Sequence, residues 1–353
     1  MSSVLSPAYM TQSLHVKPIT SESDWSAFIA ATVPHTFLHS WQWGECSRAA
    51  GHEPLRHGVY AGEVLIAVCL ALDTRARRGR FLLCPHGPVL SDASLAPEVL
   101  AVITETLARE GRARGCHWIR ISPLFPNDEA HRSLFAAHGF RPAPVHMVHP
   151  ELSWILPLAP TEDELLSGMR KSTRYSIKKA QKDGVTVRMS TSAADLETFW
   201  KVYETTVSRQ QFTPFSRSYL ATEFAIFGAA NMAAFFFAEY KGIVTGAAMI
   251  IFDKHSGYYH HGATTQAYPG LTDAQLLQWH SICEAKRRGC IEYNFWGIVP
   301  EHKTRHPWHG LSVFKRGFSG HEEAYLHAQD LPLSPRYWIT YIIETIRRIR
   351  RGL

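Results

Sequence analysis

The sequence predicts an α+β protein made of two tandem halves of one design, and three observations support this expectation. The chain has 353 residues, 45% of them hydrophobic and 12% aromatic, which is enough to bury two sizeable cores. Short landmarks recur in the same order in both halves, and one pair, Cys116 and Cys290, is 174 positions apart. The expected order in each half is helix, three strands, helix, strand, whereas a doubly wound sheet needs helices between all its strands.

The elements of the first half are predicted from its apolar runs and turn residues. GVYAGEVLIAVCLAL (58–72) is typical of two strands joined by a turn at Gly62, and RFLLCPHGPVL (80–90) of a third strand. A helix is expected over 96–114, and WIRIS (118–122) forms the strand that follows it.

The second half repeats this pattern. FAEYKGIVTGAAMIIF (237–252) predicts two strands with a turn at Gly242, and GYYHHGATT (257–265) predicts the third. A helix is expected over 273–288 and a strand over 291–297. This order matches the GCN5-related N-acetyltransferase (GNAT) fold.

We therefore predict two tandem GNAT-like domains with a cleft between them, joined near Pro150. The first domain is expected to comprise residues 14–150 together with 330–353, and the second residues 151–329.

The loops that hold coenzyme A in this fold are poorly matched. Acetyl-CoA enzymes place Q/R-x-x-G-x-G/A before a helix, where backbone N–H groups meet the pyrophosphate. GPVLSDASLAPE (87–98) lacks a second glycine. In TTQAYPGLTDAQ (264–275), Gln266 and Gly270 are misspaced and Pro269 has no N–H. We expect no such cofactor.

The positive charge of the chain is concentrated in two segments. The formal net charge is +6, and MRKSTRYSIKKAQKDGV (169–185) alone contains six basic residues and one acid. Residues 336–353 contain five arginines and Glu344. Such clustering indicates an anionic partner.

The cysteines and the apolar runs predict a cytoplasmic location. The six cysteines include no C-x-x-C pair and mostly lie in apolar runs, which is typical of buried thiols in a reducing compartment. The N-terminus has no secretory signal pattern, and the longest apolar run, 64–72, is far shorter than the roughly 20 residues of a membrane span.

Three motifs resemble those of a known family. KSTRYSIKKAQKDGV (171–185) is similar to K-x-R-x-x-I-r-k-A-x-k-x-G-V. EAKRRGCIEYNFWGI (284–298) and LSVFKRGFSG (311–320) are similar to A-k-x-x-G-x-x-x-Y-D-f-x-G-I and l-x-x-F-K-x-x-F-g-g. These are motifs of the FemABX family of aminoacyl-tRNA-dependent transferases, and the resemblance extends from about Phe37 to Gly320.

The resemblance implies a transfer of an amino acid from aminoacyl-tRNA, as co-substrate, to an amine of a UDP-linked or lipid-linked peptidoglycan precursor. Such an enzyme mainly aligns two substrates and stabilises a tetrahedral oxyanion. The family's F-K motif maps onto Phe314 and Lys315, so Lys315 is the expected catalytic residue and Phe314 is expected near the terminal adenosine of the tRNA. The alternative for Lys315 is a surface lysine in a turn before Gly317.

The acceptor side matches the family less well. The family has a lysine near Ser47 and Arg48 and an aspartate where this chain has Ser122. Arg48 and Arg217 could hold a diphosphate or carboxylate, or could simply be solvated. The acceptor-binding residues implied by the resemblance are Trp43, Ser47, Arg48, Ser122, Arg217 and Tyr219.

Histidines raise two further possibilities. His260 and His261 are expected at the end of the third strand of the second half, where His260 could relay a proton from the attacking ammonium or could simply pack in the strand. His302, His306 and His309 lie in a Pro- and Gly-containing loop without a carboxylate at ligand spacing, so no metal site is expected.

The basic segment is expected to be helical. A capping box at Thr161–Glu164 begins a helix that continues through the basic run, with Ile177 and Ala180 facing inward, until Gly184 ends it. Its face would contact the phosphate backbone of tRNA or the diphosphate of a precursor, or would be solvated. The basic residues assigned to the tRNA are Lys171, Arg174, Lys178 and Lys179.

The C-terminal segment 336–353 predicts a basic amphipathic helix. Trp338, Ile342, Ile346 and Ile349 recur at helical spacing. This stripe could lie on an anionic membrane surface or dock against the first domain.

Other functions remain open at this level. The acceptor could be a peptide natural product, the donor could be an acyl-CoA or an acyl carrier protein, or the chain could be a non-catalytic RNA- or membrane-binding module. Which amino acid would be carried is not encoded in any motif.

Overall fold

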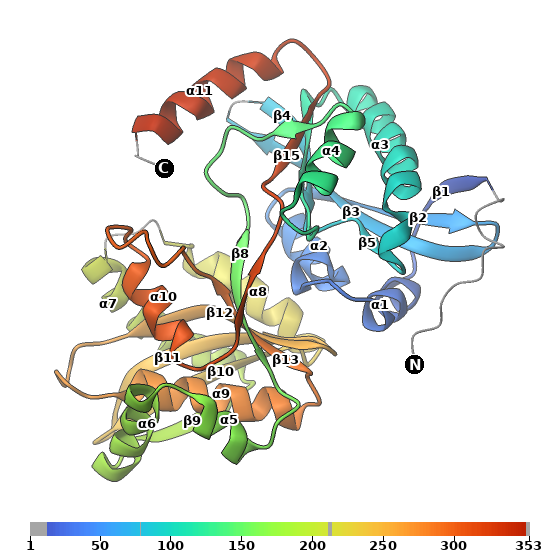
Figure 1. Cartoon of the computed structure of the whole chain (residues 1–353). Helices are drawn as coiled ribbons and strands as arrows, with labels where there is room; N and C mark the ends of the chain where they lie inside the picture. The colour runs from blue at the N-terminus through green and yellow to red at the C-terminus, as the bar shows by residue number, and fades with distance from the viewer. Residues whose placement is uncertain (1–12, 78, 211–213, 351–353) are drawn as a thin grey trace. The chain divides into compact units, whose positions relative to one another are not determined.

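The computed structural model describes residues 13–77, 79–210 and 214–350. The chain divides into two compact units, shown in Figure 1, and each is described by itself below. Unit 1 comprises residues 1–151 and 324–353, and unit 2 residues 152–323. No helix in the described part of the chain is both long and apolar enough to cross a membrane.

Unit 1 is built on one twisted sheet with the strand order β1-β2-β3-β4-β6-β15-β7, and the short β5 pairs with β3. The sheet is antiparallel except between β4 and β6, which run parallel because α3 connects them. The elements of unit 1 are β1 (Leu14–Pro18), α1 (Glu22–Ala31), α2 (Trp41–Ala49), β2 (Glu53–Ala61), β3 (Val64–Ala76), β4 (Gly79–Pro85), β5 (Val89–Leu90), α3 (Ala96–Ala113), β6 (Trp118–Ser122), α4 (Glu129–Ala137), β7 (Arg141–Pro142), β15 (Gln329–Pro332) and α11 (Tyr337–Arg350).

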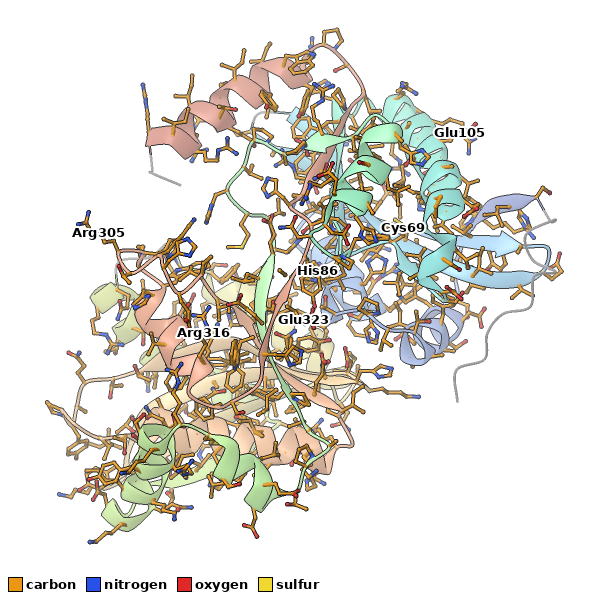
Figure 2. All side chains as sticks on the ribbon, viewed as in Figure 1. Cys69, His86, Glu105, Arg305, Arg316 and Glu323 are labelled. Atoms are coloured by element: carbon orange, nitrogen blue, oxygen red, sulfur yellow. The ribbon has the colours of Figure 1, made fainter. Side chains whose placement is uncertain are left out.

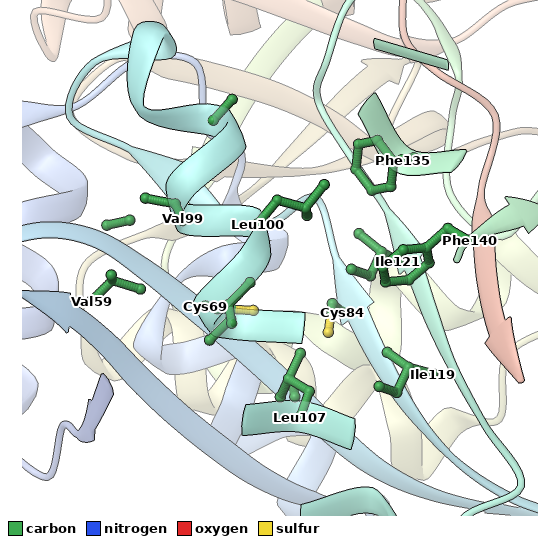
Figure 3. Close-up of a cluster of buried hydrophobic side chains, with 14 of the residues drawn as sticks. Val59, Cys69, Cys84, Val99, Leu100, Leu107, Ile119, Ile121, Phe135 and Phe140 are labelled. Atoms are coloured by element: carbon green, nitrogen blue, oxygen red, sulfur yellow. The ribbon is translucent and has the colours of Figure 1, made fainter. Parts of the chain in front are cut away.

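The main core of unit 1 lies between α3 and the sheet, as Figure 3 shows. Leu100 and Leu107 of α3 pack with Ile119 of β6, and all three are fully buried. Each such side chain contributes roughly 1.5–3 kcal/mol by leaving water. The sulfur atoms of Cys69 and Cys84 lie in this core. Five of the six cysteines are buried, as predicted, and Cys283 is half-buried.

Unit 2 repeats the architecture of unit 1, with the strand order β14-β8-β13-β12-β11-β10-β9. Its elements are β8 (Leu152–Pro157), α5 (Glu162–Gly168), α6 (Lys171–Asp183), β9 (Thr186–Ser190), α7 (Leu196–Gln210), α8 (Arg217–Ala229), β10 (Ala233–Tyr240), β11 (Ile243–Phe252), β12 (Ser256–Thr264), α9 (Asp273–Arg287), β13 (Glu292–Gly297), α10 (His309–Arg316) and β14 (His321–Ala324). The prediction of two GNAT-like halves is confirmed.

Each sheet is completed by a strand from the segments that connect the units. The chain re-enters unit 1 at Ala324, whereas the sequence predicts re-entry at residue 330. There β15 pairs with β6. In unit 2, β8 occupies the equivalent place beside β13. The completion of unit 1 is visible only in the tertiary structure, because β15 and β6 are about 200 residues apart.

Two local expectations about unit 2 are corrected. The helix that begins at the capping box ends at Gly168, and Met169 and Arg170 are extended before α6 starts at Lys171. The basic segment therefore forms a helix of its own. His260 and His261 lie in the middle of β12 rather than at its end, because the strand continues to Thr264.

The inward face of α6 is as predicted. Ile177 and Ala180 are buried together with Thr173, and Gly184 ends the helix in the left-handed conformation, with φ of 89°. The αL conformation has little cost for glycine because it lacks a Cβ atom.

Candidate functional site

The candidate site of unit 2 lies where two parallel strands diverge. β12 and β13 pair only through Ser256–Tyr258 and Glu292–Asn294 and then separate. Each strand has a bulge just beyond this point, at His260 in β12 and before Gly297 in β13. Bulges redirect side chains and end regular pairing, so they open the sheet at this fork.

The bulge in β13 is held by an unusual residue conformation. Trp296 has a φ of 66°, in the left-handed region that non-glycine residues rarely adopt. Its N–H donates to the Oδ1 atom of Asn294 at 2.8 Å. The indole packs edge-on against Tyr258 and His260, with ring centroids 5.8 and 6.3 Å apart. This local strain fixes the direction of the next carbonyl, that of Gly297.

Lys315 of α10 reaches this carbonyl from a buried position. The residue is only 4% exposed, and its Nζ atom donates to the Gly297 carbonyl oxygen at 2.7 Å. Burial lowers the pKa of Lys315 from 10.5 to about 7. The partner is a neutral carbonyl, and no carboxylate of the described residues forms an ion pair with Lys315 to offset the burial. The surface-turn alternative is therefore wrong.

The wall beside Lys315 is aromatic. Its Nζ atom lies 5.8 Å from the centre of the Tyr259 ring, and burial raises the pKa of Tyr259 to about 12. The Tyr259 hydroxyl lies over Gly262, where an added Cβ atom would be only 1.9 Å away. Gly262 thus provides the space in which the tyrosine ring lies.

The segment after Lys315 connects α10 to the basic helix α6. The Arg170 N–H donates to the Gly317 carbonyl oxygen at 3.0 Å, and a Cβ atom on Gly317 would lie 2.5 Å from the Thr173 hydroxyl. Phe314 packs against Phe318 with centroids 5.3 Å apart. The first turn of α6 is therefore fixed directly beside the end of α10 that carries Lys315.

Arg316, labelled in Figure 2, anchors α10 on its other side. It donates to the Val299 carbonyl oxygen at 2.8 Å and to Glu322 at 2.7 Å, and it is buried. The adjacent basic residues Lys315 and Arg316 thus differ in role, because Arg316 is paired with a carboxylate and Lys315 is not.

The four basic residues predicted to bind tRNA all lie on α6, but they are not equivalent. Lys171 and Lys178 are exposed. Arg174 instead folds back to the Ser167 carbonyl oxygen at 2.7 Å and to that of Met169, which stabilises the break between α5 and α6. Lys179 forms an ion pair with Asp183. Two of the four residues are therefore engaged within the protein.

The predicted proton relay is part of a buried cluster around Glu223. The Nε2 atom of His260 lies 2.9 Å from one Glu223 carboxylate oxygen, and that of His261 lies 2.8 Å from the other. The bulge turns these two neighbours to one side, with ring centroids 4.0 Å apart. The Tyr219 hydroxyl donates to Glu223 at 3.4 Å.

The electrostatics of the cluster depend on its burial. Burial alone would raise the pKa of Glu223, but His260 and His261 outweigh this effect and lower it well below its usual range. Burial, together with His260, lowers the pKa of His261 despite the neighbouring carboxylate. Glu223 therefore stays ionised, and it orients both histidines.

Glu223 was not predicted from the sequence, although a signal was present. It is the one carboxylate in an otherwise apolar stretch, YLATEFAIF (219–227), and such a residue needs a buried partner. Its oxygens and the two imidazole nitrogens lie within 4.8 Å of one another, a spacing at which a metal ion could be held. The histidines at 302, 306 and 309 do not belong to this group.

The remaining acceptor-side predictions are spread over both units. Trp43, Ser47 and Arg48 share α2 of unit 1, where Ser47 is buried and Arg48 is exposed and paired with Glu45 at 3.0 Å. Ser122 is buried at the end of β6. In unit 2, Arg217 begins α8, is exposed and pairs with Glu197 at 2.5 Å, so it does not join Tyr219 at the Glu223 cluster.

Arg48 also borders a cavity within unit 1 of about 740 Å³. Two further arginines line it: Arg56, which stacks on Trp41 at 3.6 Å from the ring centre, and Arg114. Arg56 is paired with Glu45 and Arg114 with Glu53. Each of the three arginines at the cavity therefore already has a carboxylate partner.

A set of buried histidines in unit 1 was also not predicted. The His39 Nδ1 atom bonds the Pro85 carbonyl oxygen at 2.8 Å, and burial lowers its pKa to about 4. His86, labelled in Figure 2, bonds the Thr36 hydroxyl at 2.8 Å, and burial lowers its pKa as well. These neutral imidazoles hold the chain before α2 against the β4 end of the sheet.

Comparisons with known proteins agree with this architecture. A model of the acetyltransferase (GNAT) domain family matches residues 167–304. A UDP-N-acetylmuramoylpentapeptide-lysine N(6)-alanyltransferase from Weissella viridescens is 25% identical over 235 residues, which cover 62% of this chain and 68% of that protein.

Solved structures show the same fold over nearly the whole chain. The crystal structure of FemX superimposes with a TM-score of 0.82 at 17% identity, and covers 94% of this chain and all of that one. A tandem GNAT protein from the clavulanic acid biosynthesis pathway gives a TM-score of 0.55 at 11% identity, over 92% of this chain and 99% of that one.

Proposed function

We propose that this chain is an aminoacyltransferase of the FemABX type, which forms an amide between an amino acid and an amine of a peptidoglycan precursor. The donor is an aminoacyl-tRNA, and the acceptor is a UDP-linked or lipid-linked muropeptide. The related alanyltransferase acts, by its name, on the lysine of a UDP-linked pentapeptide. The observation that carries the proposal is the buried, carboxylate-free amine of Lys315 at the fork of unit 2.

The reaction needs little covalent help from the protein. The acceptor amine attacks the ester carbonyl, a C–N bond forms, the C–O bond to the tRNA ribose breaks, and the ribose oxygen leaves with a proton. The acceptor ammonium must first lose one proton. The protein aligns the two substrates and stabilises the negative oxygen of the tetrahedral intermediate.

Lys315 supplies the stabilising charge in this proposal. Its ammonium form would face the developing oxyanion in a site from which bulk water is excluded, where a charge acts most strongly. The Gly297 carbonyl directs the amine through a 2.7 Å hydrogen bond, and the bulge at Trp296 fixes that carbonyl. Phe314, one residue before Lys315, is proposed to pack near the terminal adenosine.

His260 is proposed to accept the proton from the attacking ammonium. The carboxylate of Glu223 orients its ring through the 2.9 Å contact and stabilises the imidazolium that results. Tyr219 belongs to the same cluster and is retained as an acceptor-side residue.

The exposed lysines of α6 are proposed to bind the tRNA backbone. Lys171 and Lys178 are exposed, and the first turn of α6 is bonded to Gly317, close in sequence to Lys315. A phosphate backbone on this face would therefore lead the acceptor end toward α10. Arg174 and Lys179 contribute charge from positions already bonded within the protein.

On the acceptor side, four residues are proposed to contact the precursor: Trp43, Ser47 and Arg48 of α2 and Ser122 of β6. Among these, the guanidinium of Arg48 would bind an anionic group of the precursor. Arg217 is exposed and paired with Glu197. To bind the precursor, it would have to break this ion pair.

No bound cofactor is proposed. Asp273 places a buried carboxylate in the first turn of α9, where the pyrophosphate of coenzyme A would meet repulsion. We place the reaction in the cytoplasm, which suits the free thiols.

A direct transfer assay tests the proposal. The purified protein is incubated with tRNAs charged with radiolabelled amino acids and with UDP-linked or lipid-linked muropeptide, and label in the muropeptide is measured. Transfer from at least one aminoacyl-tRNA is expected. Transfer from acyl-CoA thioesters alone, or to an unrelated peptide alone, would contradict the assignment.

The role of Lys315 is tested in the same assay. Lys315→Met should lower the rate about 100-fold or more, in line with the loss of one oxyanion-stabilising group. Lys286→Met is the matched control, because Lys286 also donates to a backbone carbonyl, that of Leu158 at 2.7 Å, but lies in α9. An unchanged rate in Lys315→Met would rule out the assignment.

A further inference from the structure

The helix α11 exposes a continuous apolar face. Among the described residues of this helix, six large apolar side chains are between 38% and 68% exposed. They are Trp338, Ile339, Ile342, Ile343, Ile346 and Ile349. In Figure 1, α11 extends away from the sheet of unit 1. Exposed apolar patches of this kind usually mark an interaction surface.

The helix is attached to unit 1 by its opposite face. Tyr337 and Thr340 are buried, and the Tyr337 hydroxyl donates to Asp330 at 3.2 Å. Glu344 accepts from Arg120 at 3.0 Å. Residues 337, 340 and 344 follow helical spacing and so share one face. The alternative that the stripe docks on the first domain is therefore wrong for its isoleucines, which are exposed, whereas Trp338 stacks on Arg141 at 4.6 Å from the ring centre.

The charge beside the stripe is positive. Arg347, Arg348 and Arg350 lie in the last turns of α11, and Arg336 precedes it. The one acid of the helix, Glu344, is engaged with Arg120. A second copy of the chain stacked on this face would bring arginines together without acids to offset them. An anionic partner is thus favoured over self-association.

We propose that α11 binds the surface of a bilayer that contains anionic phospholipids. The isoleucines and Trp338 would enter the boundary between headgroups and acyl chains, and the arginines would contact the phosphates. The helix has 14 residues, about 21 Å at 1.5 Å per residue, so it would lie along the surface. Such binding would bring the proposed active site near a lipid-linked acceptor, but the binding itself does not depend on the proposed function.

Vesicle co-sedimentation of the full chain tests this inference. Vesicles with equal parts of phosphatidylglycerol and phosphatidylcholine should bind the protein, and vesicles of phosphatidylcholine alone should bind it weakly. The double variant Ile342→Glu/Ile346→Glu should lose most of the binding. Arg347→Gln and Arg350→Gln should each weaken it by about fivefold and reduce its salt dependence.

The controls separate this surface from general effects. Ile243→Glu changes an isoleucine of unit 2 that is 47% exposed and should bind vesicles as the unchanged protein does. All the variants alter exposed side chains, so their thermal unfolding should match that of the parent. Their transfer rates with a soluble UDP-linked acceptor, where transfer occurs, should also be unchanged.

Several results would overturn the inference. These are equal binding to both kinds of vesicle, retention of binding in the isoleucine variant, or absence of any vesicle binding. A dimer in size-exclusion chromatography with light scattering that Ile342→Glu/Ile346→Glu abolishes would assign the face to a second copy instead. Failure of aminoacyl transfer alone would leave the vesicle result standing.

Discussion

At the scale of single residues, the candidate site of unit 2 contains ionisable groups that are buried in opposite environments. Lys315 has a neutral carbonyl as its hydrogen-bond acceptor, whereas the adjacent Arg316 has Glu322. Glu223, in contrast, is surrounded by two imidazoles and a phenol. These opposite environments lower the pKa of both groups, the lysine by burial and the carboxylate by its histidines.

The first prediction concerns pH and stability. The pKa of Lys315 is lowered from 10.5 to about 7, so between these values the unfolded chain binds a proton that the native chain does not. The free energy of unfolding should therefore rise with pH across this window. The difference between the parent and Lys315→Met, measured by denaturant unfolding at several pH values, should change in favour of the parent as pH increases. A pH-independent difference would contradict the lowered pKa.

The second prediction concerns pH and rate. The ammonium form of Lys315 is lost as pH rises through about 7, so the transfer rate should decline above this value once substrates saturate. Lys315→Arg keeps a permanent charge and should show a lower rate without this decline. The measurement is the pH profile of kcat for both proteins. If kcat of Lys315→Arg declined with the same midpoint pH as that of the parent, the decline would be caused by another group.

The third prediction concerns Glu223. Glu223→Ala leaves the buried Nε2 atoms of His260 and His261 without their hydrogen-bond partner and should lower stability by about 1–3 kcal/mol for each. Glu197→Ala is the matched control, because its pair with Arg217 is exposed and should cost about 0–1 kcal/mol. Urea unfolding measures both. Equal effects would mean that the hydrogen bonds of Glu223 do not stabilise the fold.

At the scale of elements, the contact between α10 and α6 determines where the basic face lies. The two helices meet through Gly317, whose carbonyl oxygen accepts from Arg170 and whose Cα faces Thr173. The break at Met169–Arg170 allows this contact, since a continuous helix from Thr161 could not bend toward Gly317. The capping box and the apolar positions of α6 were predictable from local patterns, but the break between α5 and α6 was not.

The fourth prediction tests this contact. Gly317→Ala places a Cβ atom 2.5 Å from the Thr173 hydroxyl, so it should destabilise the protein by about 1–3 kcal/mol. Gly310→Ala, in the first turn of α10, meets nothing within 4 Å and should be neutral, or stabilising by up to about 1 kcal/mol. Thermal unfolding compares the two. If both variants behave alike, the helix contact is not tight.

The fifth prediction concerns the basic face of α6. Lys171→Gln and Lys178→Gln each remove an exposed charge and should weaken tRNA binding. Each should also reduce the slope of log affinity against log salt concentration by about 1, since one lysine neutralises about one phosphate. Lys254→Gln, in the turn after β11, is the control. Filter binding at several salt concentrations measures the slopes. An unchanged slope would place the tRNA elsewhere.

At the scale of the whole molecule, the chain completes each sheet with a segment from the connection between the units. Arg120 of β6 and Asp330 of β15 meet through two hydrogen bonds of 2.7 Å inside unit 1, although 210 positions separate them. Asp330 also accepts from Tyr337, the first residue of α11. The attachment of the C-terminal helix therefore depends on this buried pair.

The sequence by itself determined the two-fold α+β repeat and the motif that contains Lys315, because local periodicity, turn residues and short motifs encode them. Only the tertiary structure decided that Lys315 is buried without a carboxylate, that His260 and His261 share Glu223, and that the apolar face of α11 is exposed. The physical reason is that burial, bulges and pairing depend on residues that are not neighbours in the chain: 18 positions separate Gly297 and Lys315, and 210 separate Arg120 and Asp330. A linear pattern carries no information on which of its apolar or charged positions another segment will cover.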